Sequence, residues 1–70
     1  MNISEYNYLW GEEKNDWVLV HTEYGYSIVN KSNQMVLLVS DEELGDALIE
    51  RMIQEGNQRY DNINEAFEDR

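Results

Sequence analysis

Cysteine and proline are absent from this 70-residue chain, and histidine occurs only once. Without cysteine the fold can contain neither a disulfide nor a thiolate metal site. It must therefore rest on hydrophobic packing, or on packing together with a partner. A chain of this length is expected to form one domain, residues 1–70, and to bury only about 60% of the surface that its unfolded form exposes.

Targeting and membrane-spanning signals are also missing. The first residues, Met1–Glu5, have neither a basic segment nor an apolar core of the kind found in signal peptides. The longest strongly apolar run, Met35–Val39, is far shorter than the roughly 20 residues needed to cross a bilayer. These absences predict a cytoplasmic protein that does not contact membranes.

Positive charge is scarce as well. Five Lys and Arg stand against 15 Asp and Glu, which gives a net charge of −10 at pH 7. Such a charge repels nucleic-acid phosphates and anionic membranes, and it speeds association with basic proteins. The composition therefore predicts a basic protein partner and no direct contact with nucleic acid; the alternative is that acidity only keeps the domain soluble.

No catalytic or metal-binding pattern emerges. The single histidine, His21, follows an apolar strand segment and has no serine or threonine motif beside it, so we expect a strand-end residue rather than a base. Glu12–Asp16 and Asp41–Glu43 lack the spacing of a calcium loop and are typical of a turn and a helix start. We expect no enzyme activity, no cofactor and no metal site.

Four segments have the composition of β-strands, namely Tyr6–Trp10, Trp17–Thr22, Tyr26–Asn30 and Met35–Val39. Polar turns separate them, and Gly25 is free to adopt positive φ in one of these turns. Because Met35–Val39 is apolar throughout, we expect it to lie centrally in the sheet or to be covered on both faces.

A helix is predicted from about Asp41 to Glu55. Ser40 and Glu43 form a capping-box pattern at its start, and Gly56 is a plausible C-cap. The apolar positions at helical spacing are Leu44, Leu48, Ile49 and Met52. Gly45 either marks a close approach of the helix to a neighbour or has no special role.

The remaining residues predict a short edge strand at Gln58–Tyr60 and a short helix at Asn62–Glu68, where Asn62 and Glu65 repeat a capping pattern. The resulting fold class is α+β: a small antiparallel four-stranded sheet packed on one face by one main helix, with a short C-terminal strand or helix.

Two surfaces are candidates for partner binding. The first is acidic and comprises the outer helix face with the polar turn before the second strand: Glu42, Glu43, Asp46, Glu50, Glu12, Glu13 and Asp16. The second is aromatic, because the chain has more Tyr and Trp than so thin a core can bury, and it includes Trp10 and Tyr24. The alternatives are a solvated helix face and aromatic core packing.

The stretch Trp17–Lys31, WVLVHTEYGYSIVNK, followed by Val36–Leu44, VLLVSDEEL, resembles the small acidic immunity proteins of bacterial toxin–immunity systems, including those of contact-dependent growth inhibition. The resemblance implies a tight one-to-one inhibitor of a cationic toxin, often a nuclease, that blocks the groove for its substrate. It assigns no functional residue.

The sequence thus predicts an immunity-like or antitoxin-like inhibitor that occludes a basic, nucleic-acid-processing protein. An alternative is a phage-encoded counter-defence protein, such as an anti-CRISPR or anti-restriction nucleic-acid mimic. A third class is a structural or regulatory subunit whose exposed strand edge pairs with itself or with another chain. A steep loss of association rate with salt is expected only of the first two classes.

Overall fold

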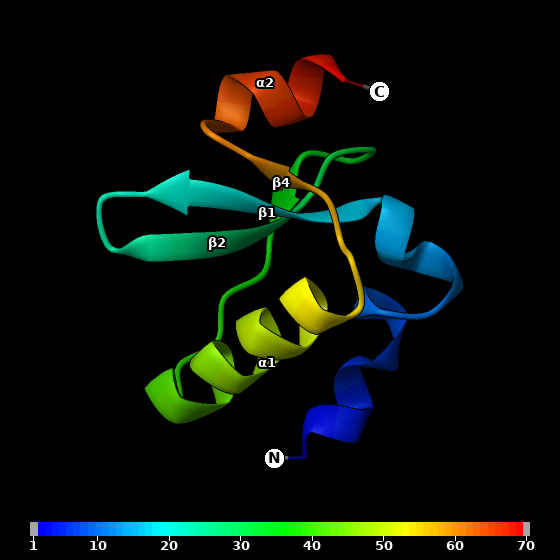
Figure 1. Ribbon diagram of the computed structural model, residues 1–70, viewed down its shortest axis with the longest axis vertical. Coiled ribbons are helices and arrows are strands. Elements are labelled where there is room, and N and C mark those ends of the chain that lie inside the picture. Colours follow the sequence, from blue (N-terminus) through cyan, green and yellow to red (C-terminus); the bar gives the residue numbers. More distant parts are fainter. Residues whose placement is uncertain (1, 70) are drawn as a thin grey trace.

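In the computed structural model, which describes residues 2–69, four strands form one mixed sheet with helices on both faces (Figure 1). The strand order is β3-β2-β1-β4, antiparallel except for the parallel pair β1–β4. The elements are the 3-10 helices η1 (Ile3–Leu9) and η2 (Glu12–Asn15), the strands β1 (Trp17–Thr22), β2 (Gly25–Asn30), β3 (Met35–Val36) and β4 (Arg59–Tyr60), and the helices α1 (Glu42–Gln54) and α2 (Ile63–Glu68). The predicted α+β class is confirmed.

The β1–β2 hairpin is the centre of the sheet and runs in register from Trp17 opposite Asn30 to Thr22 opposite Gly25. Gly25 has a φ of +123°, which an L side chain rarely adopts, so the predicted role of this glycine in the turn is confirmed. The Thr22 hydroxyl also accepts a hydrogen bond from the Tyr24 backbone N–H at 3.2 Å, which fixes the turn.

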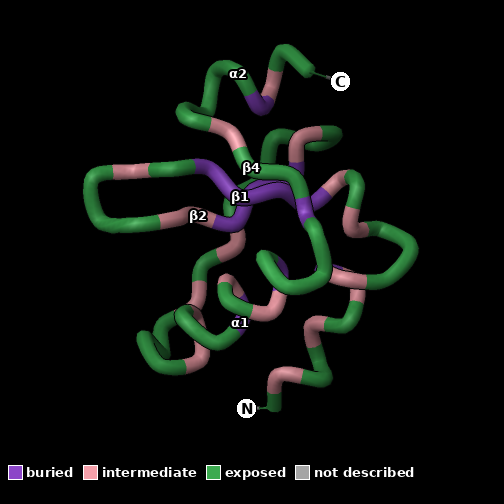
Figure 2. Tube along the Cα trace, viewed as in Figure 1, coloured by how far each residue is buried: buried purple, intermediate pink, exposed green. Residues whose placement is uncertain are grey.

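Both faces of the sheet are buried, which corrects the prediction that helices cover one face only. Trp17–Val20 are four consecutive buried residues (Figure 2), and successive side chains of a strand point to opposite faces. Trp17 and Leu19 pack with α1 and η1, whereas Val18 and Val20 pack with Ala66 of α2. A strand that is apolar on both faces requires cover on both.

The N-terminal segment is not the predicted strand Tyr6–Trp10 but η1, a 3-10 segment with a kink at Tyr6, where φ is −108° and ψ is 27°. Its buried residue is Leu9, and Ile3 and Tyr6 precede it at intervals of three residues and pack on the same core. A spacing of three places side chains on one face of a 3-10 helix. The Asn2 side chain accepts a hydrogen bond from the Ser4 N–H at 3.2 Å and so caps the helix.

The segment Met35–Val39 was also predicted wrongly, because only Met35 and Val36 form a strand and this strand lies at the edge of the sheet. Leu37 and Val39 pack against the core next to α1, but Met35, Val36 and Leu38 are exposed. The fourth strand of the sheet is instead β4, which follows α1 and lies at the other edge. Its position agrees with the short edge strand predicted at Gln58–Tyr60.

Helix α1 has the predicted faces, with Leu48 and Met52 buried and Leu44 and Ile49 half-buried against the same core. Its N-cap is Asp41 rather than Ser40: the Asp41 carboxylate accepts hydrogen bonds from the N–H groups of Glu43 and Leu44, at 3.0 and 3.4 Å. No helix within residues 2–69 is both long and apolar enough to span a membrane.

The ends of both helices agree with the sequence analysis. Gly56 has a φ of +81°, and the Gly56 and Asn57 N–H groups donate to the carbonyls of Ile53 and Met52 at 3.1 and 3.0 Å, a Schellman motif. Asn62 caps α2 by accepting from the Glu65 N–H at 2.9 Å.

Candidate functional site

A groove between η1 and η2 brings together three of the predicted partner-binding residues. Trp10, Glu12 and Glu13 line it, together with Asn7, Tyr8 and Gly11, and its volume is about 360 Å³. Glu12 and Glu13 are exposed at its rim, whereas Tyr8 and Trp10 are half-buried and pack on the core. We call these six residues the aromatic–acidic groove.

Gly11 permits the sharp turn between the two 3-10 helices. A Cβ atom at this position would lie 3.0 Å from the Asn7 carbonyl oxygen, closer than Cβ atoms normally come to a backbone atom. Because the obstacle is backbone rather than a flexible side chain, a larger residue here would require the backbone near Asn7 to shift by a few tenths of an ångström. Gly11 therefore permits the close approach of the groove turn to Asn7.

Buried Asn57 holds the groove segment against the sheet. Its side-chain amide group donates to the carbonyls of Leu9, Lys14 and Trp17, the last at 3.2 Å. These carbonyls belong to the end of η1, to η2 and to the start of β1, so one side chain at the end of α1 joins the three elements. The Asn57 Oδ1 atom is buried without a hydrogen-bond partner among residues 2–69.

Arg51 of α1 lies over the Trp10 ring, with its guanidinium carbon 4.5 Å from the ring centroid. Its Nε also lies 3.5 Å from the Glu55 carboxylate, one turn further along the helix. A guanidinium in contact with both a carboxylate and an indole combines an ion pair with a cation–π contact. Trp10 therefore already makes a cation–π contact within the chain.

Tyr8 is the groove residue whose ionisation is most affected. Burial raises the pKa of its phenol, and the nearby Tyr6 and Glu13 raise it further. Its ring packs against Trp17 with the centroids 5.4 Å apart. Tyr8 is thus a neutral, fixed wall of the groove at physiological pH, and Glu13 is close enough to contribute to its environment.

The acidic residues of α1 lie on another side of the helix. At 100° per residue, Glu42 and Asp46 fall about 140–180° round the helix from Arg51, which faces η1. All four predicted residues are exposed, and none of them forms an ion pair within residues 2–69: Glu42, Glu43, Asp46 and Glu50. The structure therefore places Glu42 and Asp46 away from the aromatic–acidic groove, and Glu43 and Glu50 between these two directions.

Two other predicted partner-binding residues lie outside the groove. Asp16 accepts a hydrogen bond from the Ser32 hydroxyl at 2.7 Å, and its backbone carbonyl accepts from the Lys31 N–H at 2.8 Å. Tyr24 is 96% exposed at the tip of the hairpin, about 17 Å along β1 from the groove. Asp16 thus stabilises the turn, and Tyr24 belongs to a different surface.

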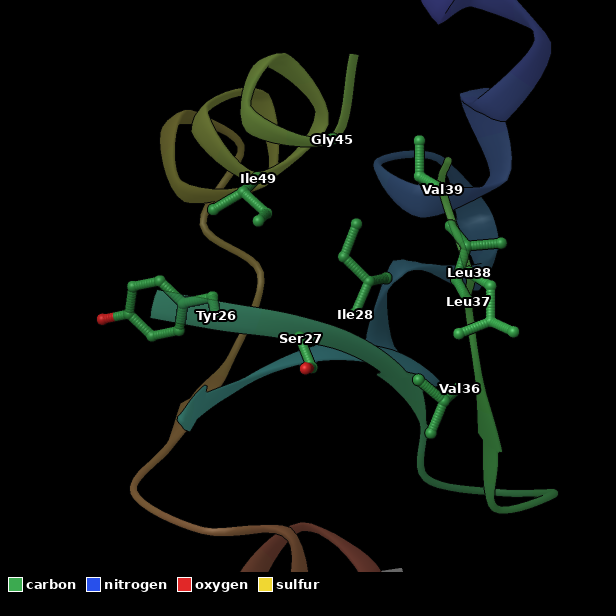
Figure 3. Close-up of a pocket in the computed structure, with 9 residues that line it drawn as sticks. All are labelled: Tyr26, Ser27, Ile28, Val36, Leu37, Leu38, Val39, Gly45 and Ile49. Carbon is green, nitrogen blue, oxygen red and sulfur yellow. The ribbon is translucent and has the colours of Figure 1, made fainter. Parts of the chain in front are cut away.

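A second groove, with a volume of about 250 Å³, is apolar (Figure 3). Ile49 and Gly45 of α1 form one side, the segment 36–39 forms the other, and Ile28 of β2 lies between them, with Tyr26 at the end of the groove below Ile49. This groove carries no charged side chain among its described lining residues. His21 lies nearby on β1, where its ring packs edge-on against Tyr26 with the centroids 5.5 Å apart.

The aromatic–acidic groove suits a positively charged side chain. Glu12 and Glu13 can accept hydrogen bonds from a guanidinium or ammonium, and aromatic rings beside them favour a nearby cation, as the contact of Arg51 with Trp10 shows. Within residues 2–69, no three His, Asp or Glu side chains are grouped in a way that could hold a metal ion. Recognition of a cationic group is what this geometry can do.

The residue pattern does not identify Asn57 or Arg51 as part of the site. Asn57 follows a helix C-cap glycine, a common position for a surface residue, and its burial depends on contacts with residues 40 or more positions away. The i, i+4 spacing predicts the pairing of Arg51 with Glu55, but it does not predict the contact of Arg51 with Trp10.

No family model matches this chain, and comparisons with curated proteins and with solved structures found no match.

Proposed function

We propose that this chain is a non-enzymatic inhibitor that binds a basic, nucleic-acid-processing protein and occludes its substrate groove. The observation that carries the proposal is the groove in which Trp10, Glu12 and Glu13 meet. Aromatic side chains beside carboxylates are typical of sites that receive arginine or lysine from a partner. The net charge of −10 would draw such a partner in from a distance.

The acidic face of α1 supports the same function. Glu42, Asp46 and Glu50 recur every four residues, so consecutive carboxylates are offset by about 6 Å along the helix axis. Regularly spaced charges on a rigid helix can replace phosphates in a basic groove. The same feature suits the second candidate, a counter-defence protein that mimics nucleic acid; the two differ in the target and not in the contact surface.

The test begins with capture of partners from a lysate of the source cell at low and at high salt, followed by purification of any basic protein retained. Association of the purified partner is then measured with Glu12→Gln/Glu13→Gln and with Asp46→Lys/Glu50→Lys. We expect on-rates to fall by about 10- to 1,000-fold, because charge pairs at such interfaces act mainly on association.

A matched control is Asp61→Asn/Glu68→Gln, which removes two exposed carboxylates beside and within α2. It changes the net charge by the same amount as Glu12→Gln/Glu13→Gln. The comparison therefore distinguishes the effect of losing contacts at the groove from the effect of lowering the overall negative charge. Equal losses for the control and the groove variant would contradict a site at the groove. A partner whose binding ignores salt would contradict the electrostatic inhibitor altogether.

An arginine-rich peptide provides an independent probe of the groove. In NMR titration at low salt, we expect the largest shifts at the Trp10 indole and at the Glu12 and Glu13 amides, and weaker shifts with a lysine peptide of equal charge, since arginine both stacks and pairs. Shifts spread evenly over all acidic residues would contradict recognition at the groove.

A further inference from the structure

One stretch of this acidic chain has no acidic residue at all. From Tyr24 to Ser40 the sequence contains neither Asp nor Glu, although 15 of the 70 residues are acidic. In the structure this stretch forms the interior strand β2, the edge strand β3 and the segment that leads to α1. The chain therefore has a neutral edge between acidic surfaces.

The neutral edge also exposes large apolar side chains. Met35, Val36 and Leu38 are 57%, 43% and 87% exposed. Edge strands in soluble proteins are usually protected by a charged residue, a proline or a covering element. Residues 35–39 contain no charged residue and no proline. In Figure 3 this segment runs along the side of the apolar groove opposite Ile49.

The backbone at this edge is ready to pair with another strand. The Leu37 N–H donates to the Ile28 carbonyl at 2.9 Å, so Leu37 faces β2. Because backbone groups alternate in direction along a strand, the N–H and C=O groups of Val36, the last residue of β3, face away from β2. No strand within residues 2–69 pairs with β3 on that side.

The charges around this edge favour a second copy of the chain over a charged partner. Lys31, the one charged residue of the acid-free stretch, is held by the Tyr60 hydroxyl at 3.4 Å and by Asp69 at 3.9 Å. The edge thus offers no free charge to attract a partner of either sign. Two copies with a net charge of −10 repel each other least where their acid-free edges meet.

We propose that two copies of this chain associate through antiparallel pairing of their β3 edges. A two-fold axis relates identical strands in this way and closes the assembly at two copies. With the axis at Leu37, Val36 of one copy lies opposite Leu38 of the other, so the exposed side chains cover one another. This dimer does not depend on the aromatic–acidic groove, which no residue of β3 lines.

The test is sedimentation equilibrium of the full chain over a range of concentrations, at low and at high salt. We expect the mass to rise from 8.3 kDa toward twice that value with concentration. Raising the salt should tighten the dimer, since screening weakens the repulsion between two acidic chains. Leu38→Lys, at an exposed position, should weaken dimerisation about tenfold or more, because it places like charges at the interface.

Tyr24→Lys is the matched control: it adds the same charge at an exposed apolar residue of the same acid-free stretch, but at the hairpin tip. Hydrogen exchange gives a second readout, in which the amides of Val36 and Leu38 become protected only at high concentration. A monomer at every concentration, equal effects of the two variants, growth beyond two copies, or dissociation on adding salt would each overturn the proposal.

Discussion

The guanidinium of Arg51 lies 4.5 Å from the centre of the Trp10 ring and joins the helix α1 to the N-terminal segment. The same side chain pairs with Glu55. Arg51 thus fixes one wall of the aromatic–acidic groove, and it does so from the side of α1 opposite Glu42 and Asp46.

Replacement of Arg51 by alanine should lower the free energy of unfolding by about 1 kcal/mol, through loss of the cation–π contact and of side-chain packing. Urea denaturation measures this loss. Arg59→Ala is the control, because Arg59 is exposed and its removal changes the net charge equally. If both variants lose the same stability, the effect comes from net charge and not from Trp10.

Asn57→Ala should destabilise the fold by about 2 kcal/mol or more, because the carbonyls of Leu9, Lys14 and Trp17 lose their common donor. Asn57→Asp should be worse, since it replaces the donor with a buried negative charge. Thermal unfolding followed by circular dichroism tests the order. Asn64→Ala, at an exposed position in α2, should change little, and a similar loss there would contradict the role of Asn57.

Replacement by alanine should have opposite effects on stability at Gly45, within α1, and at Gly56, its C-cap glycine. Gly56 has a φ of +81°, so Gly56→Ala should cost about 1 kcal/mol. A Cβ at Gly45 would meet Val39 at 3.9 Å, an ordinary contact, so Gly45→Ala should raise stability by about 0.5–1 kcal/mol. Denaturation midpoints of the two variants test this contrast; destabilisation by Gly45→Ala would show that α1 needs a closer approach.

The contact between the Tyr60 hydroxyl and Asp69 should make stability depend on pH at both extremes. The hydrogen bond from Tyr60, followed by the charge of Lys31, lowers the Asp69 pKa below 3.8, so its contribution is present above that pH and is lost as pH falls through the lower value. Burial and the bond to Asp69 raise the Tyr60 pKa from 10.0 to about 12, so this contribution is present below pH 10 and is lost as pH rises toward 12.

The stability difference between the native chain and Tyr60→Phe should therefore shrink at both ends of the pH range. Equilibrium unfolding at several pH values measures the difference. Tyr24→Phe, at a residue 96% exposed, serves as the control and should show no such dependence. A constant difference for Tyr60→Phe would contradict the coupling of Tyr60 to Asp69.

The parts of the fold that sequence patterns predicted are those set by local chemistry. The hairpin, α1, its glycine C-cap and the Asn62 cap all depend on neighbouring residues, and they were found. The strand predicted at Tyr6–Trp10 was wrong because alternating aromatics are typical of a strand. The observed segment is a 3-10 segment kinked at Tyr6, and alternation of aromatics does not distinguish the two.

Long-range features could not be derived in this way. The apolar run Met35–Val39 predicts burial, but it does not indicate which element covers these residues. In the structure Leu38 is exposed. For the candidate site, the sequence predicted that Trp10, Glu12 and Glu13 contribute to partner binding, but it did not predict the groove that they line. Asn57 holds the segment that carries them against the sheet, and its contacts span 40 or more positions of sequence.

The span of the Asn57 contacts has a kinetic consequence. A hairpin such as β1–β2 closes in microseconds, because its strands are neighbours in sequence. The bonds from Asn57 must wait until the end of α1 returns to the N-terminal segment, which requires closing a far longer loop. We therefore expect the aromatic–acidic groove to assemble late in folding and to open early in partial unfolding, so that a partner which binds there would also slow the loss of the folded state.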